Sequence, residues 1–390
     1  MMSRIGPWIV GLALCLGVST QTRIGAFGPG EALLGLTWLT AFGKVVTTRT
    51  PREPLPLQRN YLALVFVVVV WSWVGLAVSQ WLGTTYDGWL RQWLAIVLAL
   101  TFPPVVRAAW GDRFFLEMLG AMAVWTAILF GLAFVALNFV GVFVGPFELQ
   151  LFGDRFIGLS SDPNQAALII AVAMMSLLIA YYRLGWSLKG VAVLLLLLFV
   201  LGRATDSDSF LVASGFALLA AIAQLSYDRQ DKLRTGPALL VGAFFLIGVA
   251  AVLFGLYSEF DTLYAKTGQG ETRLRVWTHG IEAFLASPIT GHGPGNFSGW
   301  IAPFGNFEAH NLYIDWSAQF GIVGLMVLLL LCVRLGISLF AVRRFDGLGM
   351  LVVLMALSIF LFFARHAVFW SGIYAGLILL STRPEQERRR

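Results

Sequence analysis

Charged residues are scarce in this chain of 390 amino acids. Only 12% of the residues are Asp, Glu, Lys or Arg, whereas 58% are hydrophobic, and the mean hydropathy is +0.80. A soluble domain needs a charged surface, so this composition excludes an ordinary soluble enzyme. The net charge of +6 does not indicate a nucleic-acid partner, because in such a chain the placement of Lys and Arg matters more than their sum.

Cysteine and histidine are scarce as well. The two cysteines, Cys15 and Cys332, lie in apolar runs without the spacing of a disulfide or a metal site, which favours small core residues. The four histidines are scattered, with no HxxxH pair and no cysteine partner. We therefore expect no bound metal and no cofactor.

Apolar runs are abundant, and they recur in blocks of about 20 residues, the length of helix that crosses a bilayer. Runs such as VLLLLLFVL do not alternate between apolar and polar residues, which excludes a transmembrane β-barrel. The sequence predicts an all-α, polytopic integral membrane protein with about 12 transmembrane helices. The predicted spans are 5–20, 31–47, 61–82, 90–107, 116–144, 164–182, 187–202, 209–226, 237–257, 311–333, 348–364 and 367–381.

Lys and Arg are unevenly distributed over the predicted loops. If both termini are cytoplasmic, most of the 27 basic residues lie on the inner side, as the positive-inside rule requires. The predicted domains are helices within residues 1–257, an outer loop of residues 258–310 with a surface helix, and helices with a basic tail within residues 311–390. The basic residues left outside, where an anionic ligand could reach them, are Arg23, Arg91, Arg155, Arg203, Lys266, Arg273, Arg275 and Arg365.

The long outer loop contains a segment with helical periodicity between Thr272 and Ser287. Arg275, His279 and Glu282 share one face, and Arg273 lies at the edge of an apolar stripe on the opposite side. This pattern predicts an amphipathic helix on the outer membrane surface or against the bundle. Arginines that merely bind ordinary lipid phosphate are the alternative. The stripe consists of Leu274, Trp277, Ile281, Phe284 and Leu285.

The run GHGPGN, which follows this helix, predicts a tight turn or a re-entrant loop. It is not a phosphate-binding loop, because no GK[ST] follows. His292 in this turn, His279 on the solvated helix face and His366 beside Arg365 are weak candidates for chemistry.

His310 begins the next predicted span. Beyond it, Asn311, Asp315 and Gln319 recur every four residues, so one face of a membrane helix is polar near its outer end. A histidine at the mouth of such a face is the best general-base candidate in the chain, because imidazole, with a pKa of about 6.5, accepts a proton at neutral pH. A structural histidine at a helix start is the alternative.

Two further arginines precede helix boundaries. Arg155 lies ahead of the sequence Asp-Pro-Asn at 162–164, which is a good helix start, so capping alone would also explain this segment. Arg203 lies next to Asp206 and Asp208, and an ion pair with either is an equally simple explanation for its presence.

Together these segments resemble the superfamily of O-antigen ligases and polymerases, bacterial transferases of polyprenyl-linked glycans. The resemblance covers about residues 150–335 and is carried by RFIGLSSDPNQAA, the Arg203 segment, ETRLRVW, SPITGHGPGNF and AHNLYIDWSAQFGIVGL. Many relatives have Ser-Arg where this chain has Gly202 and Arg203, and an aliphatic residue in place of His292. The second difference indicates that His292 is incidental.

The resemblance implies a metal-independent, inverting GT-C-type glycosyltransferase in the bacterial inner membrane, with its active site facing the periplasm. The implied donor is a glycan on undecaprenyl diphosphate. His310 is then the essential base, Arg203 and Arg273 bind the donor diphosphate, and Arg275 and Arg155 are secondary donor contacts. Asn311 and Asp315 support the site.

The acceptor separates the functions within this superfamily. A ligase transfers the glycan to lipid A core, whereas a polymerase joins it to another lipid-linked repeat unit. The outer loop near 145–163 is short and one large loop dominates, which favours an O-antigen ligase, with an O-antigen or exopolysaccharide polymerase as the alternative. A transporter or flippase is less favoured, because the polar residues cluster at the outer ends of the spans rather than along a full path.

Overall fold

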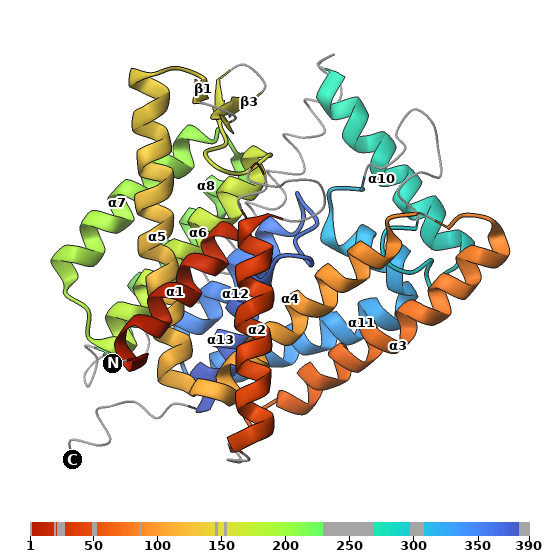
Figure 1. The fold of residues 1–390 in the computed structure, drawn as a ribbon, viewed down its shortest axis with the longest axis horizontal. Coiled ribbons are helices and arrows are strands. Elements are labelled where there is room, and N and C mark those ends of the chain that lie inside the picture. The colour runs from red at the N-terminus through yellow and green to blue at the C-terminus, as the bar shows by residue number, and fades with distance from the viewer. Residues whose placement is uncertain are drawn as a thin grey trace.

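The computed structural model describes residues 2–18, 21, 28–48, 53–85, 87–144, 147–151, 154–228, 268–296 and 308–381. These residues form a bundle of tilted helices with two small β-hairpins at one end (Figure 1). The chain is an all-α, polytopic membrane protein, as the sequence predicts.

The helices and strands have the following bounds. The first half contains α1 (Met2–Leu16), α2 (Pro29–Thr48), α3 (Gln58–Leu82), α4 (Trp89–Trp110), α5 (Asp112–Phe139), β1 (Phe143–Val144), β2 (Phe147–Glu148), β3 (Gln150–Leu151) and β4 (Arg155–Phe156). The second half contains α6 (Pro163–Leu184), α7 (Leu188–Ala204), α8 (Asp208–Asp228), α10 (Gly268–Ala286), α11 (Leu312–Ala341), α12 (Phe345–Leu357) and α13 (Ala367–Ser381). The strands pair as β1 with β2 and β3 with β4, both antiparallel.

Six helices of the described residues are long and apolar enough to cross a membrane: α3, α4, α5, α6, α8 and α11. Helices α1, α12 and α13 are apolar but shorter. Every predicted span within the described residues contains a helix. The span predicted at 237–257, the start of the outer loop with Lys266, Arg23 and the basic tail lie outside these residues.

Three predicted spans are clearly wrong at their ends. Helix α11 continues to Ala341 instead of ending at 333. Helix α5 stops at Phe139, and Phe143 and Val144, predicted to continue it, form strand β1. Helix α12 stops at Leu357 instead of continuing to 364. Its end is set by tertiary contact, because the carbonyl of Ser358 accepts a hydrogen bond from the N–H of Leu312, 2.7 Å away in another helix.

Helices α6 and α13 form the interior of the bundle. All residues from 166 to 180 of α6 are buried, and so are residues 367–379 of α13. A helix that is apolar on all sides is stable only where neighbours cover all of its faces. Helix α6 packs on α5, α7, α8 and α12, while α13 packs on α4, α11 and α12.

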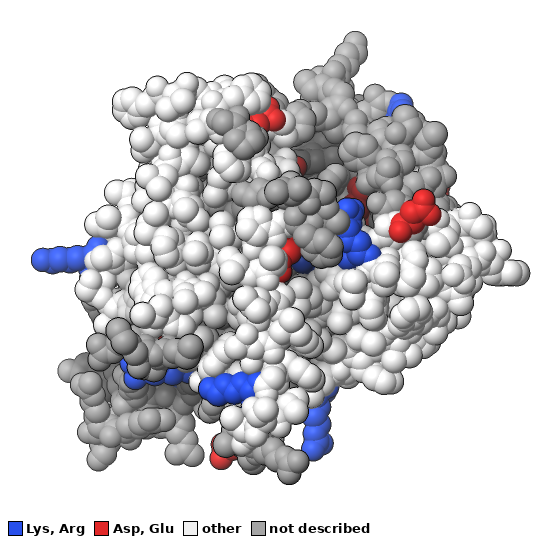
Figure 2. Space-filling view, in the orientation of Figure 1, with Lys and Arg blue, Asp and Glu red and all other residues white. Residues whose placement is uncertain are grey.

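Most of the face in Figure 2 is uncharged. Lys and Arg lie chiefly at the lower end of the molecule and in a hollow higher up, with single basic side chains at the left edge and at the upper right. An uncharged flank between charged ends is expected of helices that cross a bilayer. Helix α1 begins and α13 ends at the lower end (Figure 1).

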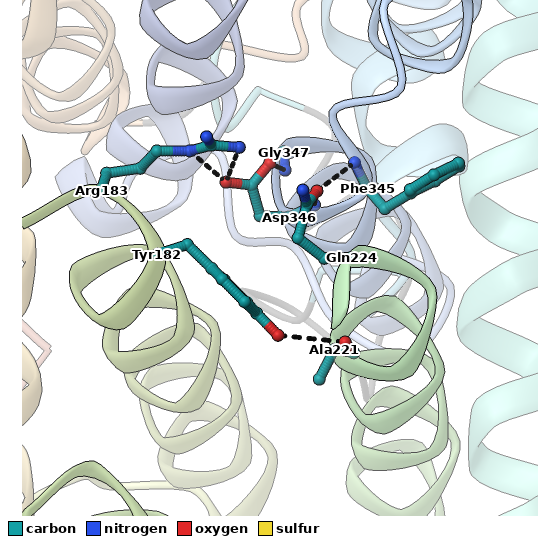
Figure 3. Close-up of polar contacts among 7 residues, drawn as sticks. All are labelled: Tyr182, Arg183, Ala221, Gln224, Phe345, Asp346 and Gly347. Carbon is teal, nitrogen blue, oxygen red and sulfur yellow. Dashed lines mark hydrogen bonds and ion pairs between the residues drawn. The ribbon is translucent and has the colours of Figure 1, made fainter. Parts of the chain in front are cut away.

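A polar cluster ties three helices together where α6 ends (Figure 3). Arg183, in the last turn of α6, pairs with Asp346 in the first turn of α12 at 2.6 Å, with 14% and 0% of their side chains exposed. Gln224 of α8 accepts hydrogen bonds from the N–H groups of Phe345 (3.0 Å) and Asp346 (3.3 Å). Because the first N–H groups of a helix have no partner within it, Gln224 supplies the acceptor that α12 lacks.

Candidate active site

The segment around His310 is held by two side chains at the start of α11, one in its first turn and one at its N-cap. Asp315 is fully buried, and its carboxyl group accepts hydrogen bonds from the N–H groups of Ala309 (2.8 Å) and Asn311 (3.1 Å). Asn311 in turn caps α11, because its Oδ1 atom accepts from the N–H groups of Tyr313 (3.0 Å) and Ile314 (3.2 Å). Both residues predicted to support His310 therefore fix the backbone beside it.

His310 itself has a left-handed backbone, with φ at 53°. This conformation costs a residue other than glycine about 1–2 kcal/mol, and such strain persists only where the surroundings impose it. Here the Asp315 carboxyl group and the Asn311 cap impose it from both sides. His310 is half-buried, directly before the N-cap residue of α11.

Helix α10 packs directly against this segment. Gly280 faces Ile314 and Ala309 so closely that an added Cβ atom would lie 2.5 Å from Ile314 Cγ2 and 3.1 Å from Ala309 Cβ. Ala283, also fully buried, packs on Ala318 of α11. Arg275 lies on this helix with an exposed side chain. The helix is thus placed beside His310, while the side chain of Arg273 lies outside the described structure.

The helix predicted between Thr272 and Ser287 is confirmed, and of the two placements predicted for it, the exposure of its apolar stripe contradicts packing of that stripe against the bundle but not a position on the membrane surface. Ile281 and Leu285 of the stripe are 48% and 65% exposed. The face that packs on α11 is made of small residues, because small side chains let two helices approach closely. His279 and Glu282 lie together as expected, with Nδ1 and Oε2 3.1 Å apart.

The glycine-rich segment is a tight turn docked on a break in α11. Gly321 has φ 63° and ψ −169°, which interrupts the helix. The carbonyls of Ala318 and Gln319 accept hydrogen bonds from the N–H groups of His292 and Gly293, each 2.9 Å away. Backbone groups inside a membrane protein must find partners within the protein, and the turn supplies them.

His292 has a structural role that the sequence did not indicate. It is fully buried, and its Nε2 donates a hydrogen bond to the carbonyl of Ala283 at 2.8 Å. The hydroxyl of Ser79 in α3 donates to the His292 carbonyl at 2.6 Å. Burial lowers the pKa of His292 from its ordinary value of 6.5, and the bond to Ala283 opposes that shift. This histidine joins α3, α10 and α11.

A second group of polar residues brings the Arg155 and Arg203 segments together. Arg155 donates from Nε to the carbonyl of Thr205 at 3.1 Å, just past the end of α7. The hydroxyl of Ser207 donates to Asn164 Oδ1 at 2.9 Å, at the start of α6. Asp162 caps α6 through the N–H groups of Asn164 and Gln165, as predicted.

The side chain of Arg203 is exposed. Across the described residues it forms no ion pair with Asp206 or Asp208, so the simple pairing explanation is wrong. Gly202 beside it lies against the ring of Phe210, which occupies the space that a side chain at 202 would need. The neighbouring phenylalanine therefore accounts for glycine at this position.

Residues 156–329 match the family model described as O-antigen ligase. This match supports placing this part of the chain in the O-antigen ligase superfamily. No curated protein matches the chain. The family supports glycosyltransferase activity of the O-antigen ligase or polymerase type. We refer to residues 156–329 as the ligase domain.

The ligase domain contains six of the seven predicted site residues, and Arg155 directly precedes it. The structure joins His310, Asn311 and Asp315 and places the helix of Arg275 against them. It joins Arg155 to the Arg203 segment separately. The hairpin strand β3 and helix α10 both lie toward the upper end of the molecule in Figure 1.

The sequence did not indicate the contacts of Arg365, which lies outside the ligase domain, with Glu308 inside it and Gln92 outside it. Arg365, in the turn between α12 and α13, pairs with Glu308 at 2.8 Å and reaches Gln92 of α4 at 3.2 Å. The available signal was that Arg365 is a basic residue on the predicted outer side. Nothing in the sequence indicated its partners, which lie 57 and 273 positions away.

Proposed function

We propose that this protein is an O-antigen ligase that moves a glycan from undecaprenyl diphosphate to a hydroxyl group of lipid A core. The observation that carries the proposal is the construction of the His310 segment within the ligase domain. The half-buried His310 is held in a strained backbone conformation by Asp315 and Asn311, and the arginine-bearing helix α10 packs against the same segment. Strain that the surroundings impose is typical of functional sites.

In the proposed reaction His310 takes the proton of the acceptor hydroxyl. The hydroxyl oxygen forms a bond to the anomeric carbon while the bond from that carbon to the diphosphate oxygen breaks, and the configuration inverts. The diphosphate leaves with the electron pair. Arg203 and Arg273 hold it, with Arg275 and Arg155 as further contacts, because guanidinium groups bind phosphate oxygens in pairs and stabilise developing charge.

Arginines in this role remove the need for a divalent metal. Lysine keeps the charge of arginine but lacks its planar fork of donors, so R203K should lose much of the donor binding. Arg203 suits such a contact because its side chain is exposed and forms no ion pair with its neighbouring aspartates in the described structure.

The test is transfer by purified protein from a lipid diphosphate-linked glycan, with a chelator present. H310A should abolish transfer, while H279A, which removes a histidine from the outer face of α10, should retain it. Near-normal transfer by folded H310A would refute the proposed base. Product on lipid A core alone identifies a ligase, whereas lengthening of a second glycan-lipid identifies a polymerase.

We also propose that the protein lies in a bacterial inner membrane with both termini in the cytoplasm and the candidate active site facing the periplasm. Arg91 and Arg113 are both exposed, and the predicted topology places Arg91 on the outer side of the membrane and Arg113 on the inner side. A cysteine at position 91 should react with an impermeant maleimide in spheroplasts, and one at position 113 should not. The native Cys15 and Cys332 are buried and do not interfere. The reverse labelling would overturn this orientation.

A further inference from the structure

The ion pair between Arg365 and Glu308 is largely buried and has several further contacts, unlike a solvent-exposed ion pair. The two side chains are 26% and 10% exposed, and the nitrogen and oxygen atoms are 2.8 Å apart. A second nitrogen of the same guanidinium group donates to Gln92 Oε1 at 3.2 Å. The guanidinium also lies 5.9 Å from the ring centre of Phe362. Three neighbours therefore determine the direction of this one arginine.

The pair acts on the chain immediately before His310. Glu308 is two residues ahead of the histidine, and the N–H between them, that of Ala309, is held by Asp315. On the other side, the N–H of Leu312 is bonded to the carbonyl of Ser358. The left-handed backbone of His310 is thus anchored at both ends, and the anchor on the Glu308 side comes from the turn before α13 and from α4.

The stability of the fold alone does not explain why this position has an ion pair of Arg365 and Glu308 instead of apolar residues. Removing two charges from water costs free energy, so an apolar pair of similar size would often stabilise the fold as well or better. What an arginine and a carboxylate supply is direction, because the planar fork of N–H groups donates to its acceptors at fixed angles. Fixed direction matters most beside a residue whose backbone is strained.

We infer that Arg365 and Glu308 are positioning residues for His310. The inference rests on the proposed function, since it assigns no chemistry to either residue and requires only that His310 be the base. The ligase domain, residues 156–329, is then incomplete without the turn between α12 and α13. A competing assignment places Arg365 among the donor-binding arginines, with Glu308 as a partner that the diphosphate displaces.

The test compares E308Q, R365Q, R365K and the E308Q/R365Q double variant, using a lipid diphosphate-linked glycan as donor at equal amounts of monodisperse protein. Each glutamine variant should lower kcat roughly ten- to a hundredfold, because displacement of a catalytic group by about 1 Å has an effect of this order. KM for the donor should stay unchanged. The double variant should fall no further than the worse single variant, and R365K should recover part of the loss.

Three outcomes would overturn the inference. If R365Q raises KM for the donor and E308Q does not, Arg365 binds the donor. If kcat falls only as far as the fraction of folded protein falls, measured by thermal unfolding in detergent, the pair is merely structural. If H310A is inactive while E308Q and R365Q keep full kcat, the positioning role fails and the proposed function stands; active H310A instead removes the proposed base.

Discussion

The substitution D315N offers the sharpest test of how the His310 segment is built. Asp315 is fully buried, and its two carboxyl oxygens accept the N–H groups of Ala309 and Asn311 at 2.8 and 3.1 Å. Asparagine has nearly the same shape but keeps only one acceptor oxygen, because an NH2 donor replaces the other. One of the two backbone N–H groups must then face a donor.

The magnitude follows from the cost of a buried donor without an acceptor. That cost is about 1–3 kcal/mol. The segment can avoid it only by moving the N–H away from position 315, which displaces His310 from the conformation that the two bonds impose. If this cost adds in full to the free energy needed to bring His310 into its reactive conformation, transfer should slow by about 5- to 150-fold.

The assay is the initial rate of glycan transfer by purified D315N, with thermal unfolding measured in the same detergent. The matched control is S317A in the same helix, because the Ser317 hydroxyl donates only to the carbonyl of Ile314 in its own helix, and its loss leaves no backbone N–H without an acceptor. S317A should transfer at close to the normal rate. A folded D315N with unaltered transfer would show that the carboxyl group does not position His310.

Three other perturbations test the framework around the site. D346N leaves the buried guanidinium of Arg183 without its anionic partner and should lower the unfolding free energy by about 3–5 kcal/mol, whereas R113Q, in a pair whose arginine is 83% exposed, should have little measurable effect on thermal unfolding. G280L overfills the contact between α10 and α11 and should destabilise this packing by about 1–3 kcal/mol and slow transfer, measured by unfolding and by initial rate. Because burial holds the pKa of His292 below 6.5, the unfolded chain binds a proton that the folded turn does not, so stability should fall as the pH drops below 6.5, and H292Q should remove this part of the pH dependence of unfolding.

The Arg183–Asp346 cluster also offers a control for distance (Figure 3). It lies at the far end of α6 from Asn164, and a helix of 22 residues is about 33 Å long. Folded D346N protein should therefore keep its transfer rate even though its stability is reduced. A loss of transfer beyond the loss of folded protein would contradict this separation.

Local chemistry made several features predictable from the sequence. Apolar runs of about 20 residues have one stable environment, so the helices and the membrane class follow from composition and length. The start of α6 follows from Asp162, because a side chain that caps a helix bonds to residues two and three positions along. The small distance along the chain also places Asn311 and Asp315 near His310, since a side chain in the first turn of a helix can bond to the N–H groups just before it.

Contacts between distant helices were decided only by the tertiary structure. Periodicity located α10 and its apolar stripe, but the face that packs is the one with Gly280 and Ala283, because only small residues fit against α11. The end of α12 at Leu357 and the ion pair of Glu308 with Arg365 depend on how separate helices pack. A sequence pattern reports the faces of its own helix, whereas the partner of each face is set by the shapes and charges of segments far along the chain.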